Sequence, residues 1–171
     1  MSIEEFRQFG GSTPELSITG VKSYGRLVDI YDGDSVKVIL PVFGSYYKFT
    51  IRLDGIDTCE IRSKDTVLQE YAIKARDRLF ELLTDNTPYT KVYNKIDAKK
   101  DIKKLLDAEV YLVWVECGNK DKYGRILANI YKDKASSQSV SSILLEEKLA
   151  YRYEGKTKLT DDMIKEVLNI I

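Results

Sequence analysis

The segment from Tyr47 to Leu53 most constrains the fold, because its apolar and polar side chains alternate with a period of two. Such alternation predicts a β-strand with one buried face, and the other face of this strand carries Arg52. Turn residues such as Asp32-Gly33 separate this segment from other β-prone segments. We therefore predict four more strands, over residues 24–31, 35–40, 108–117 and 125–131.

Apolar side chains spaced three and four residues apart predict three amphipathic helices. The first begins at Asp65 or Thr66, either of which can cap it, and ends near Leu83. The second begins near residues 138–139, and the third is capped by Thr160. The charged stretch 97–106 is expected to form a short surface helix with a solvated face rather than a binding patch.

This order of elements, β-β-β-α-β-β-α, favours an α+β fold that is mainly β: a five-stranded OB-fold barrel with three helices packed outside. With 171 residues, of which 43% are hydrophobic, the chain can build one ordinary core. Residues 1–21 show little periodicity and are predicted to be an N-terminal extension, and residues 22–171 a single domain. The Lys- and Asp-rich stretch 85–107 is interpreted as an insertion in that domain.

Composition excludes several kinds of chemistry. The chain contains no histidine, which rules out Ser-His-Asp and Cys-His triads and zinc sites built on imidazole.

Two cysteines make no disulfide framework, and the acidic N-terminus does not resemble a signal peptide, so we expect an intracellular protein. No segment approaches the roughly 20 apolar residues of a membrane-spanning helix. We expect a monomer with no membrane partner.

The stretch from Arg52 to Glu60 gathers groups suited to phosphodiester hydrolysis at the end of the predicted strand. The stretches 32–35 and 121–125 supply further carboxylates and a second arginine. Carboxylates can hold a hard divalent cation, and guanidinium groups bind phosphate oxygens bidentately. Taken alone, each stretch is more often a plain turn, a surface strand or an ordinary hairpin, so the hypothesis depends on their combination. Because the 27 basic residues equal the 27 acidic ones, a local basic patch must attract any nucleic acid.

Four motifs, in order, resemble those of the staphylococcal nuclease family over roughly residues 24–153. They are DGDSV at 32–36, RLDGIDTCE at 52–60, YAIKA at 71–75 and DKYGRILA at 121–128. Each motif alone is weak, but four at compatible spacings on a compatible strand pattern are specific. The fold of that family is an OB barrel with three helices, which agrees with the prediction made above from the strand and helix patterns.

The resemblance implies a Ca²⁺ site and a general base. Asp34 and Asp57 would ligate Ca²⁺ together with the backbone carbonyl of Thr58, since hard cations prefer oxygen ligands. Glu60 would act as the general base or orient the attacking water. Cys59 stands where the family usually has proline, and a proline would hold that turn more firmly.

The resemblance also implies how a nucleic acid is bound. Arg52 and Arg125 would bind the phosphate oxygens and stabilise the charge that grows in the transition state. The expected activity is Ca²⁺-dependent endonucleolytic cleavage of DNA and RNA, single-stranded or frayed, with little sequence preference and 3′-phosphate products. Further substrate-binding positions are Lys122, Tyr123, Tyr151 and Tyr153.

Two alternatives stay open. A catalytically silent nuclease-like module would bind nucleic acid or a protein partner, although such modules typically lose the ligand and arginine residues that are retained here. An OB-fold protein that stacks the bases of single strands would depend on Tyr151 and Tyr153, and the zero net charge counts against it.

Overall fold

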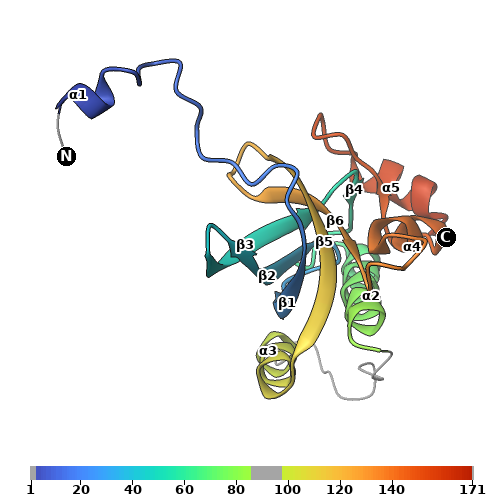
Figure 1. Cartoon of the computed structure of the whole chain (residues 1–171). Helices are drawn as coiled ribbons and strands as arrows, with labels where there is room; N and C mark the ends of the chain where they lie inside the picture. The colour runs from blue at the N-terminus through green and yellow to red at the C-terminus, as the bar shows by residue number, and fades with distance from the viewer. Residues whose placement is uncertain (1–2, 86–97, 171) are drawn as a thin grey trace.

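The computed structural model describes residues 3–85 and 98–170. Its main strands are β1 (Lys22–Ile30), β2 (Ser35–Val42), β3 (Ser45–Leu53), β5 (Tyr111–Lys120) and β6 (Ile126–Tyr131). They form a closed barrel in the order β1-β2-β3-β6-β5 (Figure 1). Neighbouring strands are antiparallel except β3 and β6, which run parallel and pair Ile51 with Ile126. The predicted five-stranded barrel is confirmed.

The three predicted helices lie together on one side of the barrel (Figure 1). They are α2 (Thr66–Leu83), α4 (Val140–Glu146) and α5 (Asp161–Leu168). A polar side chain caps each one by accepting a hydrogen bond from a backbone N–H of the first turn; these caps are Asp65, Ser139 and Thr160.

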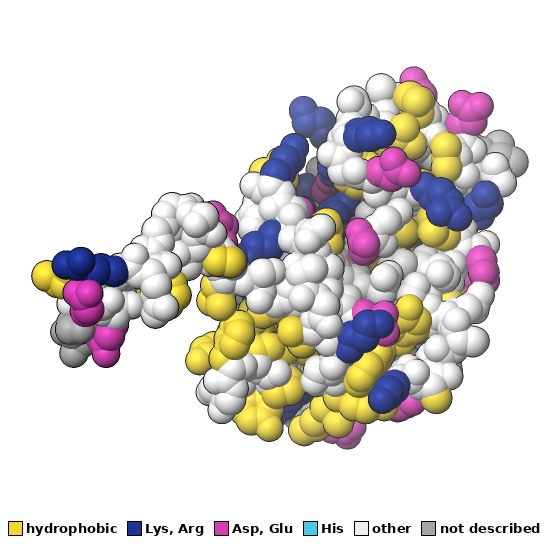
Figure 2. All heavy atoms as spheres, turned by 45° about the horizontal axis from the view of Figure 1, so that its top comes forward, with side chains coloured by type: hydrophobic (Ala, Val, Ile, Leu, Met, Phe, Trp, Pro, Cys, Tyr) yellow, Lys and Arg dark blue, Asp and Glu magenta, His cyan; other side chains and the backbone are white. Residues whose placement is uncertain are grey.

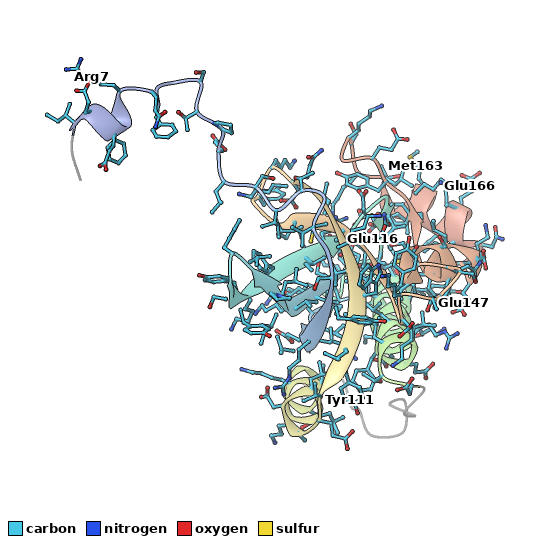
Figure 3. The ribbon with its side chains drawn as sticks, in the orientation of Figure 1. Arg7, Tyr111, Glu116, Glu147, Met163 and Glu166 are labelled. Carbon is cyan, nitrogen blue, oxygen red and sulfur yellow. The ribbon has the colours of Figure 1, made fainter. Side chains whose placement is uncertain are left out.

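One ion pair joins two of these helices. Glu147, labelled in Figure 3, follows α4. Its Oε1 lies 2.7 Å from Nη2 of Arg78 on α2. Arg78 also contacts Glu81 of its own helix at 3.1 Å. Because the pair is partly exposed, it should add little to the stability of the fold. Its main effect is to fix how α2 and α4 pack against each other.

Helix α3 (Ala98–Ala108) lies at the lower end of the barrel in Figure 1. Ile102 and Leu106 are fully buried in the barrel core, and Nη2 of Arg26 donates to the carbonyl of Leu106 at 3.4 Å. The sequence predicted only a surface helix here, because two apolar side chains four residues apart among lysines give a weak signal. The remainder of the predicted insertion, residues 86–97, lies outside the described residues.

The N-terminal extension leads away from the barrel and carries the short helix α1 (Ile3–Phe6) (Figure 1). It joins the barrel at Ile18, which is buried in the core, and at Gly20, whose N–H donates to the carbonyl of Cys117 at 2.8 Å. None of the helices within residues 3–85 and 98–170 combines the length and apolar character needed to cross a membrane.

A second, smaller core lies beside the barrel. Strand β4 (Ile56–Asp57) pairs antiparallel with β7 (Tyr151–Arg152), and both are too short to show an alternating pattern in the sequence. The loop after β4 packs there against α2 and α5, which fixes the position of the residues that follow Asp57. The buried members of this core are Cys59, Leu68, Ala72, Tyr151, Ile164 and Leu168.

Candidate active site

An open cleft with a volume of about 920 Å³ lies where β3 ends and β4 begins. Its walls come from four parts of the chain, within residues 31–34, 52–60, 121–127 and 153–158. Figure 2 shows Lys and Arg side chains around a hollow between the barrel and the part that carries α5, with acidic side chains among them. The fold therefore brings the three stretches singled out in the sequence to one place and adds the segment after β7.

The turn between β1 and β2 places Asp34 in this cleft. The carbonyl of Asp34 accepts a hydrogen bond from the N–H of Leu53 at 2.8 Å, which ties the turn to the end of β3. Gly33 packs so closely that an added Cβ would lie 2.7 Å from the Cβ of Ala75 and 2.9 Å from the methyl group of Thr58. Only glycine lets the turn sit this close to α2.

We expect Gly33→Ala to lower the free energy of unfolding by about 1–3 kcal/mol, because the extra methyl group overpacks the contact with α2. Urea denaturation measures this loss. Gly10→Ala is the matched control, since nothing lies within 4 Å of its added Cβ, and it should change stability by less than about 0.5 kcal/mol. A Gly33→Ala protein as stable as the wild type would contradict the close packing.

Arg52 lies between the two predicted metal ligands. Its Nη2 donates to Oδ1 of Asp57 at 2.6 Å and lies 3.1 Å from Oδ2 of Asp34, and its Nη1 donates to Oδ1 of Asp34 at 3.3 Å. Nη2 also contacts the carbonyl of Ile56 at 3.3 Å. The three charged side chains are at most 10% exposed, so these ion pairs form away from bulk water and hold the guanidinium in one orientation.

The two carboxylates have opposite pKa shifts. Burial, reinforced by the charge of Asp32, raises the pKa of Asp34 well above its ordinary value despite the nearby Arg52. Burial also acts to raise the pKa of Asp57, but the hydrogen bond and charge of Arg52, with the charge of Lys158, outweigh it and lower that pKa. The negative charge of Asp34 is therefore incompletely compensated, a condition that favours binding of a further cation.

Tyr151 supports Asp57 from the neighbouring strand. The two residues face each other in the β4–β7 pair, and the Tyr151 hydroxyl donates to Oδ2 of Asp57 at 2.9 Å. Burial and this carboxylate raise the pKa of the hydroxyl, which keeps it a proton donor. Because Tyr151 is 2% exposed, its ring offers no face to a nucleobase. The base-stacking role suggested by the sequence does not fit this position.

Tyr153, the other predicted stacking residue, lines the cleft. The guanidinium carbon of Arg52 lies 5.6 Å from the centroid of its ring, and its hydroxyl donates to the carbonyl of Lys156 at 2.8 Å. The backbone N–H of Tyr153 donates to the carbonyl of Gly55 at 3.0 Å. These contacts attach the segment after β7 to the opposite wall and leave Tyr153 beside the predicted phosphate ligand.

Arg125 enters the cleft from the turn between β5 and β6. Its Nε donates to Oδ2 of Asp121 at 2.7 Å, while Oδ1 of Asp121 accepts hydrogen bonds from the backbone N–H groups of Tyr123 and Arg125. Tyr123 is 73% exposed, and the centroid of its ring lies 5.1 Å from Nζ of Lys122 and 5.7 Å from the guanidinium carbon of Arg125. Asp121 thus shapes the turn, and the turn presents two cations and one aromatic ring.

Glu60 follows β4, and its side chain is 66% exposed, so water can reach its carboxylate. The two residues before it, Thr58 and Cys59, are 4% and 2% exposed and anchor the loop. Burial raises the pKa of the Cys59 thiol to about 11, which argues against a thiolate nucleophile at neutral pH. Oε1 of Glu60 accepts a hydrogen bond from Nζ of Lys158 at 2.5 Å.

The donors at Asp34 and Asp57 fit a hard divalent cation. Both carboxylates contact the same nitrogen of Arg52, so they lie close together, and the charge of Asp34 is undercompensated. Within the described ranges, no three His, Cys, Asp and Glu side chains are grouped to hold a metal ion. A backbone carbonyl, for which Thr58 is the candidate, and water would have to complete the shell, as is usual for Ca²⁺.

Sequence reasoning missed Lys158. It follows Glu154-Gly155-Lys156-Thr157, a polar run that is typical of a surface loop. The cleft brings its ammonium group to Glu60 and within 3.6 Å of Oδ2 of Asp57. The only sequence signal is that it lies a few residues after Tyr153.

Comparison with known proteins shows that a family model covers most of the residues that form this cleft. The family model described as "Staphylococcal nuclease homologue" matches residues 50–170. These residues include the ends of β3 and β4, the turn at 121–125 and the segment after β7, which together form most of the cleft.

Three curated relatives each align with 82% of this chain. "Uncharacterized protein MJ1439" of Methanocaldococcus jannaschii is 32% identical over 143 residues, which cover 64% of its length. "Endonuclease YncB" of Bacillus subtilis is 30% identical over 148 residues and 56% of its length. "SPbeta prophage-derived endonuclease YokF", also of Bacillus subtilis, is 37% identical over 149 residues and 40% of its length. The chain thus spans less than two thirds of each relative.

Proposed function

This chain belongs to the staphylococcal nuclease family, and from that premise we propose that it is a Ca²⁺-dependent endonuclease that hydrolyses phosphodiester bonds of DNA and RNA. The observation that carries the proposal is that one cleft contains Arg52, Arg125 and Glu60 together with the Asp34–Asp57 pair. Two of the relatives are themselves named endonucleases. We further propose single-stranded or frayed substrates, little sequence preference, 3′-phosphate products and a monomeric enzyme.

The chemistry assigns a task to each group. A phosphodiester resists hydrolysis because its negative charge repels nucleophiles and its alkoxide leaves poorly. Arg52 and Arg125 would bind the non-bridging oxygens and offset the charge that grows in the transition state. Glu60, exposed in the cleft, would take the proton of the attacking water. Ca²⁺ held by Asp34 and Asp57 would supply Lewis-acid polarisation of the phosphoryl group.

The residues around these groups position them. Tyr151 orients Asp57 through its hydroxyl, and Asp121 orients Arg125 through its carboxylate. Lys122, Tyr123 and Tyr153 line the cleft and would contact the phosphates and bases next to the scissile bond. An extended single strand suits such an open cleft better than a stacked duplex, because its bases are free to meet aromatic rings.

Digestion of end-labelled single-stranded DNA and RNA tests this function. We expect cleavage with added Ca²⁺, none with chelator, and none by an Arg52→Ala, Glu60→Ala double variant. Labelled fragments that end in a 3′-phosphate would establish which bond of the phosphodiester breaks. Absence of cleavage with any divalent cation would overturn the proposal, and nucleic-acid binding that persists in chelator would then identify a binding module.

A further inference from the structure

The segment after β7 brings a cation to the predicted base and to one predicted metal ligand. Nζ of Lys158 lies 2.5 Å from Oε1 of Glu60 and 3.6 Å from Oδ2 of Asp57. These two carboxylates come from the other wall of the cleft, 98 residues away from Lys158 in the case of Glu60. The ammonium group therefore sits between the predicted base and a carboxylate that would hold the proposed cation.

Two cations thus flank Asp57, and they differ in exposure and in the number of groups that hold them. Arg52 contacts Oδ1 of Asp57, is 10% exposed, and is held further by Asp34 and the carbonyl of Ile56. Lys158 lies near the other oxygen, Oδ2, and is 52% exposed on an irregular segment. Since its ammonium ends a flexible four-carbon stem, Lys158 is the cation that can leave without disturbing the barrel.

We propose that Lys158 is an internal counter-ion that compensates Asp57 and Glu60 before the divalent cation binds, and so lowers the affinity of the site for that cation. The inference rests on the proposed Ca²⁺ site. A cation arriving at Asp57 meets the ammonium group either as a competitor for the same carboxylates or as a like charge a few ångströms away. In both cases removal of the ammonium group favours binding of the divalent ion.

Calorimetric titration of the chelator-treated 171-residue chain with Ca²⁺, without nucleic acid, tests this role. We expect Lys158→Met to bind Ca²⁺ about tenfold more tightly than wild type, which corresponds to ~1.4 kcal/mol. Lys158→Arg, which keeps the charge, should stay near the wild-type affinity. Lys158→Gln provides a second neutral variant, and circular dichroism verifies that each variant is folded.

Lys156→Met is the matched control, because it removes the same charge from the same segment. Its side chain is 84% exposed and contacts only Glu154, at 3.6 Å, among the ion pairs of the described residues. It should leave Ca²⁺ affinity unchanged. An equal gain in Ca²⁺ affinity in Lys156→Met and Lys158→Met would mean that net charge alone is responsible, and would overturn the counter-ion role.

The titration also separates this inference from the proposed function. Unchanged or weaker Ca²⁺ binding by Lys158→Met, in a protein whose wild type still cleaves nucleic acid, overturns the counter-ion role alone. No Ca²⁺ binding by any variant and no cleavage overturn both. Ca²⁺ binding that is measurable in Lys158→Met and Lys158→Gln but not in the wild type would also support the counter-ion role. A merely structural lysine would give no gain in affinity.

Discussion

Replacing Arg52 with alanine is expected to lower both the stability and the activity of the protein. The free energy of unfolding should fall by about 3–5 kcal/mol, because the substitution leaves Asp34 and Asp57 as buried carboxylates without their shared partner. Cleavage should fall by about 10³-fold or more, since the guanidinium also stabilises transition-state charge. Urea denaturation and initial rates of oligonucleotide cleavage measure the two effects.

The loss of stability in Arg52→Ala should depend on pH. In the wild type the lowered pKa of Asp57 adds stability above its unfolded-state pKa, and this is lost as the pH falls through the lowered value. Without Arg52, burial should raise the pKa of Asp57 and should raise that of Asp34 further than in the wild type, so both ionised groups should destabilise the variant at neutral pH. Acidification from about pH 7 to about pH 5 should therefore reduce the difference in free energy of unfolding between variant and wild type. An increase in that difference would contradict this charge arrangement.

Arg125→Ala is the matched comparison. Arg125 is 29% exposed and pairs with Asp121 alone among the described ion pairs, so its removal should cost at most about 1 kcal/mol of stability. Its loss of activity should nevertheless approach that of Arg52→Ala. If both arginines change stability equally, or if Arg125→Ala cleaves normally, the division of roles between them is wrong.

Replacing Glu60 with glutamine is expected to reduce the cleavage rate by about 10²–10⁴-fold, the usual contribution of a general base. Glutamine keeps the shape of the side chain but cannot accept the proton. Because Glu60 is 66% exposed and its one ion-pair partner among the described residues is the half-exposed Lys158, the stability of the fold should change by less than about 0.5 kcal/mol. Steady-state kinetics should locate the loss in kcat rather than in KM.

Glu154→Gln controls for charge in the same cleft. Glu154 also lines the cleft, is 82% exposed and pairs with Lys156 only weakly, at 3.6 Å. Its neutralisation should leave the rate within about twofold of wild type. Comparable losses of cleavage rate in Glu60→Gln and Glu154→Gln would indicate that the rate depends on the negative charge of the cleft rather than on proton transfer to Glu60. Full activity of Glu60→Gln would remove Glu60 from the mechanism.

The strands and helices were predictable because their signals are local. The alternation of residues 47–53 predicted strand β3, although burial follows the alternation only in part: Ile51 and Leu53 are fully buried, whereas Tyr47 is 50% exposed and Arg52 only 8%. The carboxylate of Asp65 caps α2 through the next few residues. The grouping of Arg52, Asp57 and Glu60 was predictable for the same reason, since they lie within nine residues at the end of one strand. Helix α3 was expected, but the burial of Ile102 and Leu106 was not, because it depends on the open end of a barrel formed elsewhere in the chain.

The sequence by itself therefore determined the barrel, the helices and the groups available for chemistry, whereas the tertiary structure decided what those groups contact. Tyr151 and Asp57 are 94 residues apart, and only the pairing of β4 with β7 makes the tyrosine a buried donor rather than a stacking platform. Lys158 reaches Glu60 only because the segment after β7 lines the same cleft. Periodicity and capping are set by neighbours within a few residues, but burial and charge compensation depend on every segment that the fold brings to the same place.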